Sequence, residues 1–201
     1  MSHLSQNETY WNHQKFAAHR IAKKHLMGAS SSPEGVTAQR AEDRLHHLAA
    51  TDALTGLANY RRLSETVESE IKRSERTARS FAVLIFDLNG MKRINDRHGH
   101  PAGNCALCCL ADIFRTSCRS VDTAARYGGD EFALVLPETD ANEADAVGRR
   151  ICERLSNDRE EPRLSMSVGA AVYPEDGTTN ETLFQAADRA LYKMKHLKNT
   201  L

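Results

Sequence analysis

The stretch Phe81-Ala-Val-Leu-Ile-Phe86-Asp87-Leu88-Asn89-Gly90 decides how this chain folds. Its first six residues form a short, continuous apolar run of β-forming side chains, which is typical of a central strand buried on both faces. The run ends abruptly in polar residues, so Asp87 is expected to leave the strand directly into solvent. The pattern predicts the middle of a sheet with a carboxylate at its end.

Two further strand-like runs, 123–127 and 132–136, flank Gly128-Gly129-Asp130-Glu131, and a connection of this length predicts a β-hairpin. Apolar spacing predicts helices after Asn59 as the N-cap, over 101–118, around 141–155 and over 183–194, with a last strand over 164–172. The order α-β-α-β-β-α-β-α predicts an α+β fold. It is a ferredoxin-like, mostly antiparallel sheet flanked by helices.

The chain ahead of this pattern is expected to be a separate segment. Residues 28–36 are a turn-forming, weakly hydrophobic stretch that predicts a linker. After it, Ala38, Ala41, Leu45 and Leu48 lie on one seam of a helix, which either pairs two subunits or lies on its own domain. We therefore divide the chain into an N-terminal helical extension, 1–50, and a domain over 51–201.

Composition excludes several classes of partner. Lys+Arg and Asp+Glu are equal at 27 each, so no overall field attracts DNA, RNA or an anionic membrane. The longest apolar run is far short of the ~20 residues that span a bilayer, and no signal segment opens the chain, which predicts a cytoplasmic protein without a membrane span. Four of the five cysteines crowd residues 105–118 and are interpreted as reduced, mostly buried thiols rather than a zinc site.

The hairpin turn carries the first indication of chemistry. If its strands neighbour the strand that ends at Asp87, the carboxylates of Asp87, Asp130 and Glu131 converge. Carboxylates in such proximity repel one another unless a hard divalent cation lies among them, and Mg²⁺ with triphosphate oxygens suits this arrangement. Gly128 and Gly129 would let backbone approach a ligand, although they would equally serve a simple turn.

At this point the residues match a family. Tyr127-Gly-Gly-Asp-Glu-Phe132 resembles the signature of GGDEF diguanylate cyclases, and other blocks follow in family order over residues 51 to 201. They are Asp52-Ala-Leu-Thr-Gly-Leu-Ala-Asn59, Asp87-x-Asn-x-x-Lys92-x-x-Asn95-Asp96-x-x-Gly99-His100, Ser167-Val-Gly169 and Ala187-Asp-x-Ala-Leu-Tyr192-x-x-Lys195. The resemblance implies a palm-type core that condenses two GTP into cyclic di-GMP and releases two pyrophosphates.

The resemblance also implies roles for individual residues. Asp87, Asp130 and the backbone carbonyl of Leu88 would hold Mg²⁺, for which Mn²⁺ can substitute; Asp130 would also accept a proton, with Glu131 as the neighbouring acid. Other positions would contact the nucleotide or neutralise its phosphates: Lys92, Lys195, Asn95, His100, Asn104, Gly128 and Gly129. Because each domain of the family binds one triphosphate, catalysis would require a homodimer.

Arg119-Ser-Val-Asp122 resembles the R-x-x-D inhibitory site that binds the cyclic dinucleotide product in many members. The guanidinium can fork onto a phosphate, and the carboxylate can accept hydrogen bonds from guanine. A local surface salt bridge is the alternative interpretation.

Four departures from the family pattern limit what the resemblance implies. Asn104 and Asn89 stand where aspartates are usual, Gly90-Met91 replaces an often aromatic pair, and Lys198-Asn199 replaces Gly-Arg. The metal acids are kept, which favours an active enzyme over a degenerate module that binds GTP or cyclic di-GMP as an effector. A template-dependent polymerase palm would need basic surface that the neutral composition lacks. At position 104, asparagine predicts that ATP is accepted beside GTP, giving cyclic GMP-AMP.

Overall fold

The computed structural model describes residues 50–157 and 163–199. The helical extension and linker predicted over residues 1–50 lie outside the described residues except for Ala50, so they stay predictions. The described elements, in chain order, are α3 (Tyr60–Thr77), β1 (Phe81–Leu88), α4 (Met91–His98), α5 (His100–Ser117), β2 (Thr123–Arg126), β3 (Glu131–Pro137), α6 (Ala141–Ser156), β4 (Met166–Tyr173) and α7 (Asn180–Asn199).

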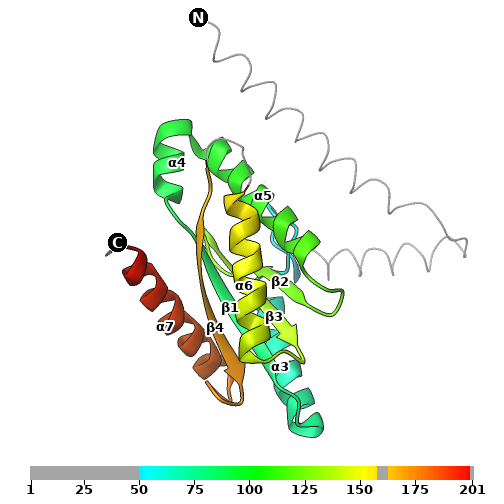
Figure 1. Cartoon of the computed structure of the whole chain (residues 1–201). Helices are drawn as coiled ribbons and strands as arrows, with labels where there is room; N and C mark the ends of the chain where they lie inside the picture. Colours follow the sequence, from blue (N-terminus) through cyan, green and yellow to red (C-terminus); the bar gives the residue numbers. More distant parts are fainter. Residues whose placement is uncertain (1–49, 158–162, 200–201) are drawn as a thin grey trace, which may run out of the picture. The chain divides into compact units, whose positions relative to one another are not determined.

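The four strands form one sheet in the order β2-β3-β1-β4, and every neighbouring pair is antiparallel. Figure 1 shows the long strands side by side, with β1 between β3 and β4. This order is that of a ferredoxin-like sheet: the first and last strands, β1 and β4, pair with each other, and the hairpin β2–β3 joins the sheet through β3, which pairs with β1. The predicted α+β class and the buried central strand β1 are confirmed.

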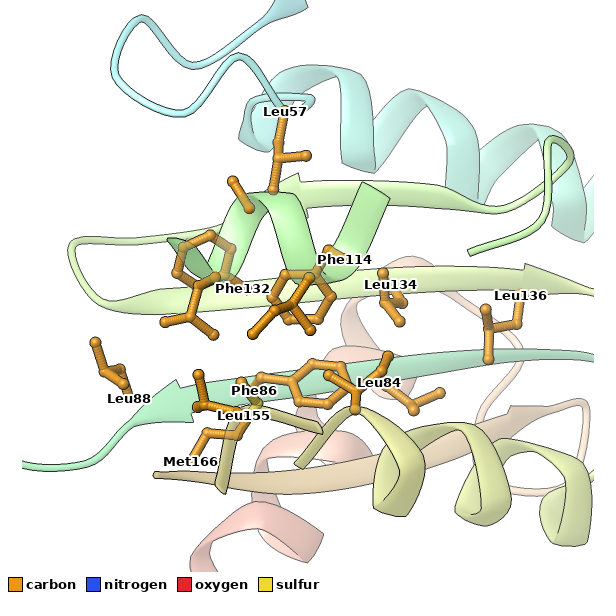
Figure 2. Packing of buried hydrophobic residues seen from close by; sticks show 14 of the residues in the cluster. Leu57, Leu84, Phe86, Leu88, Phe114, Phe132, Leu134, Leu136, Leu155 and Met166 are labelled. Atoms are coloured by element: carbon orange, nitrogen blue, oxygen red, sulfur yellow. The ribbon is translucent and has the colours of Figure 1, made fainter. Parts of the chain in front are cut away.

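One face of the sheet packs against α5 and α6. The even-numbered residues of β1, such as Leu84 and Phe86, belong to the apolar cluster on this face. Figure 2 shows Phe86, Phe114 and Phe132 gathered in that cluster. Phe114 of α5 packs against both strands, with ring centroids 5.0 Å from Phe86 and 5.3 Å from Phe132. The packing of Phe114 against Phe86 and Phe132 therefore holds α5 against β1 and β3.

The opposite face packs against α3 and α7. The odd-numbered residues Phe81, Val83 and Ile85 of β1 belong to this second cluster, together with side chains of both helices. Gly169 of β4 allows the closest approach, because a Cβ there would lie 2.2 Å from the carbonyl oxygen of Ala187 in α7. Alternation along β1 therefore directs Asp87, two residues after Ile85, toward the α3 and α7 face.

Helix α4 is the element that the sequence patterns did not predict. It begins after Gly90, whose φ of 75° falls in the left-handed region, and Gly99 with φ 81° separates it from α5. Ile94 is the one buried residue of this short helix, so it lacks the apolar period that indicates longer helices. Another difference is small: Glu131 begins β3 rather than lying wholly in the turn.

Within the described residues, no helix combines the length and apolar character that crossing a membrane requires.

Candidate active site

Three polar side chains lie in a row across the end of the sheet. In the strand register, Asp87 of β1 is opposite Glu131 of β3 and also opposite Ser167 of β4. Paired residues of neighbouring strands project from the same face, so all three face α3 and α7. The prediction that the hairpin lies beside Asp87 depended on β1 and β3 being neighbours, and they are.

The hairpin turn brings Asp130 to the end of β1. The backbone N–H of Leu88 donates to the carbonyl oxygen of Asp130 at 3.1 Å, so these two residues are joined directly. Gly128 leaves room for a neighbouring acid, because a Cβ there would lie 2.5 Å from Oε2 of Glu131. Gly129 has open space around its missing side chain. A side chain at the first glycine of the turn would therefore displace the Glu131 carboxylate, and the second glycine leaves the turn accessible.

The acidic side chains at this edge interact electrostatically. Burial raises the pKa of Glu131, and the negative charges of Asp87 and Asp130 raise it further. Lys195 of α7 partly compensates, with Nζ 2.7 Å from Oδ2 of Asp87 in an ion pair whose side chains are 37% and 18% exposed. The site thus concentrates negative charge at the end of β1 and places one cation against it.

The donor atoms at this edge suit Mg²⁺. The carboxylates of Asp87 and Asp130 and the carbonyl of Leu88 are hard oxygen donors, and a divalent cation among them would relieve the repulsion between these carboxylates and Glu131. Among the described residues, no three His, Cys, Asp or Glu side chains are close enough together to hold a metal by themselves. Such a ligand set needs further oxygens, which triphosphate or water supplies for Mg²⁺.

A depression of about 910 Å³ opens beside Asp87. It is lined by Asp87, Asn89, Gly90, Lys92, Arg93, Asp96, Arg97, Ser167 and Lys195. Asn89 is held by β4 and the residue before it, because its Nδ2 donates to Ser165 Oγ at 3.2 Å and its Oδ1 accepts from Ser167 Oγ of β4 at 3.3 Å. The structure thus brings Lys92 and Lys195, two predicted site residues, to the same depression as Asp87.

The predicted base-contacting residues lie on α4 and α5. Asn95 packs against Gly103, where a Cβ would lie only 2.1 Å from its Oδ1, and that oxygen is buried without a hydrogen-bond partner. An acceptor in this position is suited to a ligand N–H. Asn104 follows Gly103 and is exposed, and His100 is exposed at the start of α5. Neither Asn104 nor His100 lines the depression beside Asp87.

Arg126 contacts the signature turn, and the sequence patterns did not single it out. Its guanidinium donates to the carbonyl oxygen of Gly129 at 2.6 Å and 3.1 Å, and its Nη1 lies 3.3 Å from both carboxylate oxygens of Asp52. Asp52 also accepts from the N–H and the hydroxyl of Thr55. Burial alone would raise the pKa of Asp52, but the Thr55 hydrogen bonds and the Arg126 charge outweigh it and lower the pKa. Arg126 immediately precedes the signature, and that position was the available signal.

Arg119 and Asp122 lie apart from this site, on the segment before β2. The carboxylate of Asp122 is only 4% exposed and accepts from the backbone N–H of Arg119 at 2.7 Å and from its Nε at 3.2 Å. Arg119 also donates to Thr139 Oγ1 at 2.9 Å. Burial raises the pKa of the neighbouring Cys118 thiol to about 11, and the guanidinium of Arg150 on α6 is close enough to act against this rise. The ion pair of the alternative interpretation is therefore present, with two arginines near the same thiol.

Comparison with known proteins follows this geometry. Residues 49–200 match the family described as diguanylate cyclase, GGDEF domain. The chain is 38% identical over 171 residues to the bifunctional diguanylate cyclase/cyclic di-GMP phosphodiesterase MucR of Pseudomonas aeruginosa, covering 83% of this chain and 25% of MucR. The chain therefore spans about a quarter of that relative's length.

Solved structures agree with the fold. A sensory box/GGDEF family protein from Caulobacter crescentus has 37% identity and a TM-score of 0.68, over 73% of this chain and 98% of that one. The GGDEF domain of DgcB from Caulobacter crescentus, solved in complex with c-di-GMP, has 26% identity and a TM-score of 0.67, over 74% and 91%. With its family match, its ferredoxin-like sheet and its signature turn beside Asp87, the chain belongs to the GGDEF diguanylate cyclase family.

Proposed function

We propose that this domain condenses two GTP into cyclic di-GMP with release of two pyrophosphates. The observation that supports this most directly is the group of charged side chains at the end of β1. The carboxylate of Asp87 lies beside the Gly-Gly-Asp-Glu turn and opens onto a depression lined by lysines and arginines. Because its substrates are nucleoside triphosphates, we place the protein in the cytoplasm.

The reaction forms a bond between the 3′-oxygen of one nucleotide and the α-phosphorus of the other, and it breaks the bond from that phosphorus to the bridging oxygen of pyrophosphate. Mg²⁺ held by Asp87, Asp130 and the Leu88 carbonyl would polarise the α-phosphate and favour ionisation of the 3′-hydroxyl. The carboxylate of Asp130 accepts the proton of the attacking hydroxyl, with Glu131 beside it. Lys92 and Lys195 offset negative charge on the departing phosphates.

One domain holds one triphosphate, so ring closure needs a second copy of the chain with its site facing the first. The homodimer is therefore part of the proposal, and the helix predicted from the sequence ahead of residue 50 is proposed as the segment that pairs the subunits. Each half-reaction uses the 3′-hydroxyl of the nucleotide held by the other subunit.

Base recognition is assigned to Asn95 and Asn104, with His100 at the same helix junction. The unpartnered Oδ1 of Asn95 suits a donor of the base. An aspartate at position 104 would only accept hydrogen bonds and would therefore reject the N1 acceptor of adenine, whereas the amide of Asn104 both donates and accepts. We infer that ATP enters beside GTP, so that cyclic GMP-AMP, and cyclic di-AMP at high ATP, accompany cyclic di-GMP.

Product binding is assigned to Arg119 and Asp122, with Arg150 as a second guanidinium near Cys118. Asp122 is buried and already bonded to Arg119, so product contacts would come from the exposed guanidinium of Arg119 rather than from a free carboxylate. The DgcB domain, of the same family, was solved with c-di-GMP. A bound product at this position would limit further synthesis.

Product analysis tests the function. The protein is incubated with Mg²⁺ and GTP, ATP or an equimolar mixture, and the products are identified by mass spectrometry. Cyclic di-GMP from GTP alone is expected, and Asp130→Ala should lower the rate by ~10²-fold or more while the fold is retained. Asp145→Ala, on the exposed surface of α6, is the matched control.

The outcomes separate the parts of the proposal. Near-normal turnover by Asp130→Ala would refute the site assignment. A wild-type protein that binds GTP or cyclic di-GMP without turnover would instead be the degenerate effector module. Cyclic di-GMP alone from the mixed incubation would refute ATP acceptance, and a mixed product that Asn104→Asp narrows toward cyclic di-GMP would support it.

A further inference from the structure

The depression beside Asp87 contains more positive charge than its acids balance. Four cationic side chains line it, Lys92, Arg93, Arg97 and Lys195, against the carboxylates of Asp87 and Asp96. Lys195 and Asp87 already form an ion pair with each other. Three cations and one acid are left, and within the described part of the chain Lys92, Arg93 and Arg97 form no salt bridge.

Several other arginines among the described residues have carboxylate partners. Arg73 and Arg79 share the carboxylate of Glu138, and Arg126 pairs with Asp52. Cations that lie together without partners repel one another, and an anionic ligand relieves that repulsion. The charge left over in the depression is therefore suited to a phosphate group.

Arg93 has the geometry to reach such a group. It lies in the first turn of α4, and its Nη2 is 3.0 Å from the position that a Cβ on Gly90 would occupy. The guanidinium therefore folds back over the loop that joins β1 to α4, on the side of the depression. Gly90 leaves this space free, and a larger residue there would push the guanidinium away.

Arg97 lies one helical turn after Arg93, and residues four apart on a helix are neighbours on its surface. Both side chains line the same depression, so α4 contributes two planar guanidinium groups to it. A terminal phosphate carries a charge of about −2 and three strong acceptor oxygens, which two guanidinium groups match in shape and number of donors. The ammonium groups of Lys92 and Lys195, by comparison, act as point charges and lack this planar arrangement of donors.

We propose that Arg93, assisted by Arg97, binds the γ-phosphate of the nucleotide and makes the site selective for triphosphates over diphosphates. This proposal rests on the proposed function, because it assigns the cations of the same depression that remain after Lys92 and Lys195 have been assigned to the charge of the departing pyrophosphate. A diphosphate lacks the group that these two arginines hold. The pair would therefore favour GTP over GDP, which resembles the substrate in base, ribose and two phosphates.

Equilibrium binding tests the assignment without turnover. Isothermal titration calorimetry with Mg²⁺ uses two guanine nucleotides, a triphosphate and a diphosphate, each with a methylene group in place of the oxygen between the α- and β-phosphorus. Wild type is expected to prefer the triphosphate. Arg93→Ala should weaken triphosphate binding about tenfold, as loss of a charge-assisted fork does, and change diphosphate binding by less than about twofold.

Control variants sharpen the comparison. Arg97→Ala should act in the same direction with a smaller effect, and Arg93→Lys should recover part of the loss because it keeps the charge without the fork. Arg149→Ala removes an exposed helical arginine of α6 that pairs with Asp145, and it should leave both affinities unchanged. Circular dichroism of each variant checks that the helices are retained.

Two failures are distinct. If wild type binds neither analogue, the proposed function is refuted and this proposal with it. If wild type binds both and Arg93→Ala keeps the full preference for the triphosphate, or weakens both ligands equally, the γ-phosphate assignment alone is refuted.

Discussion

Replacing Gly169 by alanine should separate α7 from the sheet. The added Cβ would lie 2.2 Å from the carbonyl oxygen of Ala187 and 2.2 Å from the backbone nitrogen of Leu191, with the Cα of Leu191 at 2.8 Å. All three are backbone atoms, so no side-chain rotation relieves the contact. The helix itself has to move.

The size of the effect follows from these distances. Non-bonded heavy atoms rest ~3.5–4.0 Å apart, so α7 must retreat by about 1 Å along much of its buried face. Overpacking of this kind costs about 1–3 kcal/mol, and the upper part of that range applies because the obstacle is backbone. Leu183, Ala187 and Leu191 would lose close packing against the sheet.

Urea denaturation followed by circular dichroism measures the cost. With a slope of about 1–3 kcal/mol per molar urea, the midpoint of Gly169→Ala should fall by roughly 1 M. Gly129→Ala is the matched control, because nothing lies within 4 Å of the Cβ that it adds. A Gly169→Ala midpoint equal to those of wild type and Gly129→Ala would refute the packing argument. Lys195, one turn beyond Leu191, should also pair less closely with Asp87.

Three other perturbations have defined outcomes. Folding lowers the pKa of Asp52 from 3.8, so the ionised carboxylate stabilises the fold fully above that pH, and this stabilisation is lost as the pH falls through the folded pKa. Urea titrations should therefore show that Asp52→Asn destabilises the protein most at neutral pH. The difference in unfolding free energy between wild type and variant should shrink below pH 3.8. Asp140→Ala removes the cap of α6, where Asp140 accepts from the N–H of Glu143, and should cost about 0.5–2 kcal/mol in the same assay; an unchanged midpoint would contradict the capping role. Arg119→Ala should weaken cyclic di-GMP binding in calorimetry and relieve product inhibition, and unchanged affinity would leave Arg119 and Asp122 as a structural ion pair.

The strands and the position of the turn over residues 128–131 could be predicted because their signals are local. A continuous apolar run such as Phe81–Phe86 indicates a buried strand wherever it lies, and the four residues between two such runs indicate a hairpin. A ferredoxin-like fold makes β1 and β3 neighbours, so Asp87 at the end of β1 lies beside the turn that precedes β3. Helix α4 could not be found in this way, since one buried side chain creates no period.

Contacts between distant parts of the chain were beyond the sequence patterns. Asp52 and Arg126 are 74 positions apart, and nothing local in either segment indicates that they meet. The ion pair of Lys195 with Asp87 was likewise unforeseen, although both residues were expected at the site. The burial of Asp122 depends on the packing of its whole turn and has no signature in the four residues Arg119-Ser-Val-Asp122.

The bonds of Arg126 have a mechanical consequence. Asp52 belongs to the stretch by which the chain enters the domain, and through one guanidinium it is tied to the carbonyl oxygen of Gly129 in the turn that carries Asp130. Ala58 of the same stretch exchanges backbone hydrogen bonds with Ala124 and Arg126. A displacement of the chain at Asp52 would therefore be passed to Gly129 through two hydrogen-bonded contacts of one side chain. We expect the entry stretch and the turn that carries Asp130 to move together.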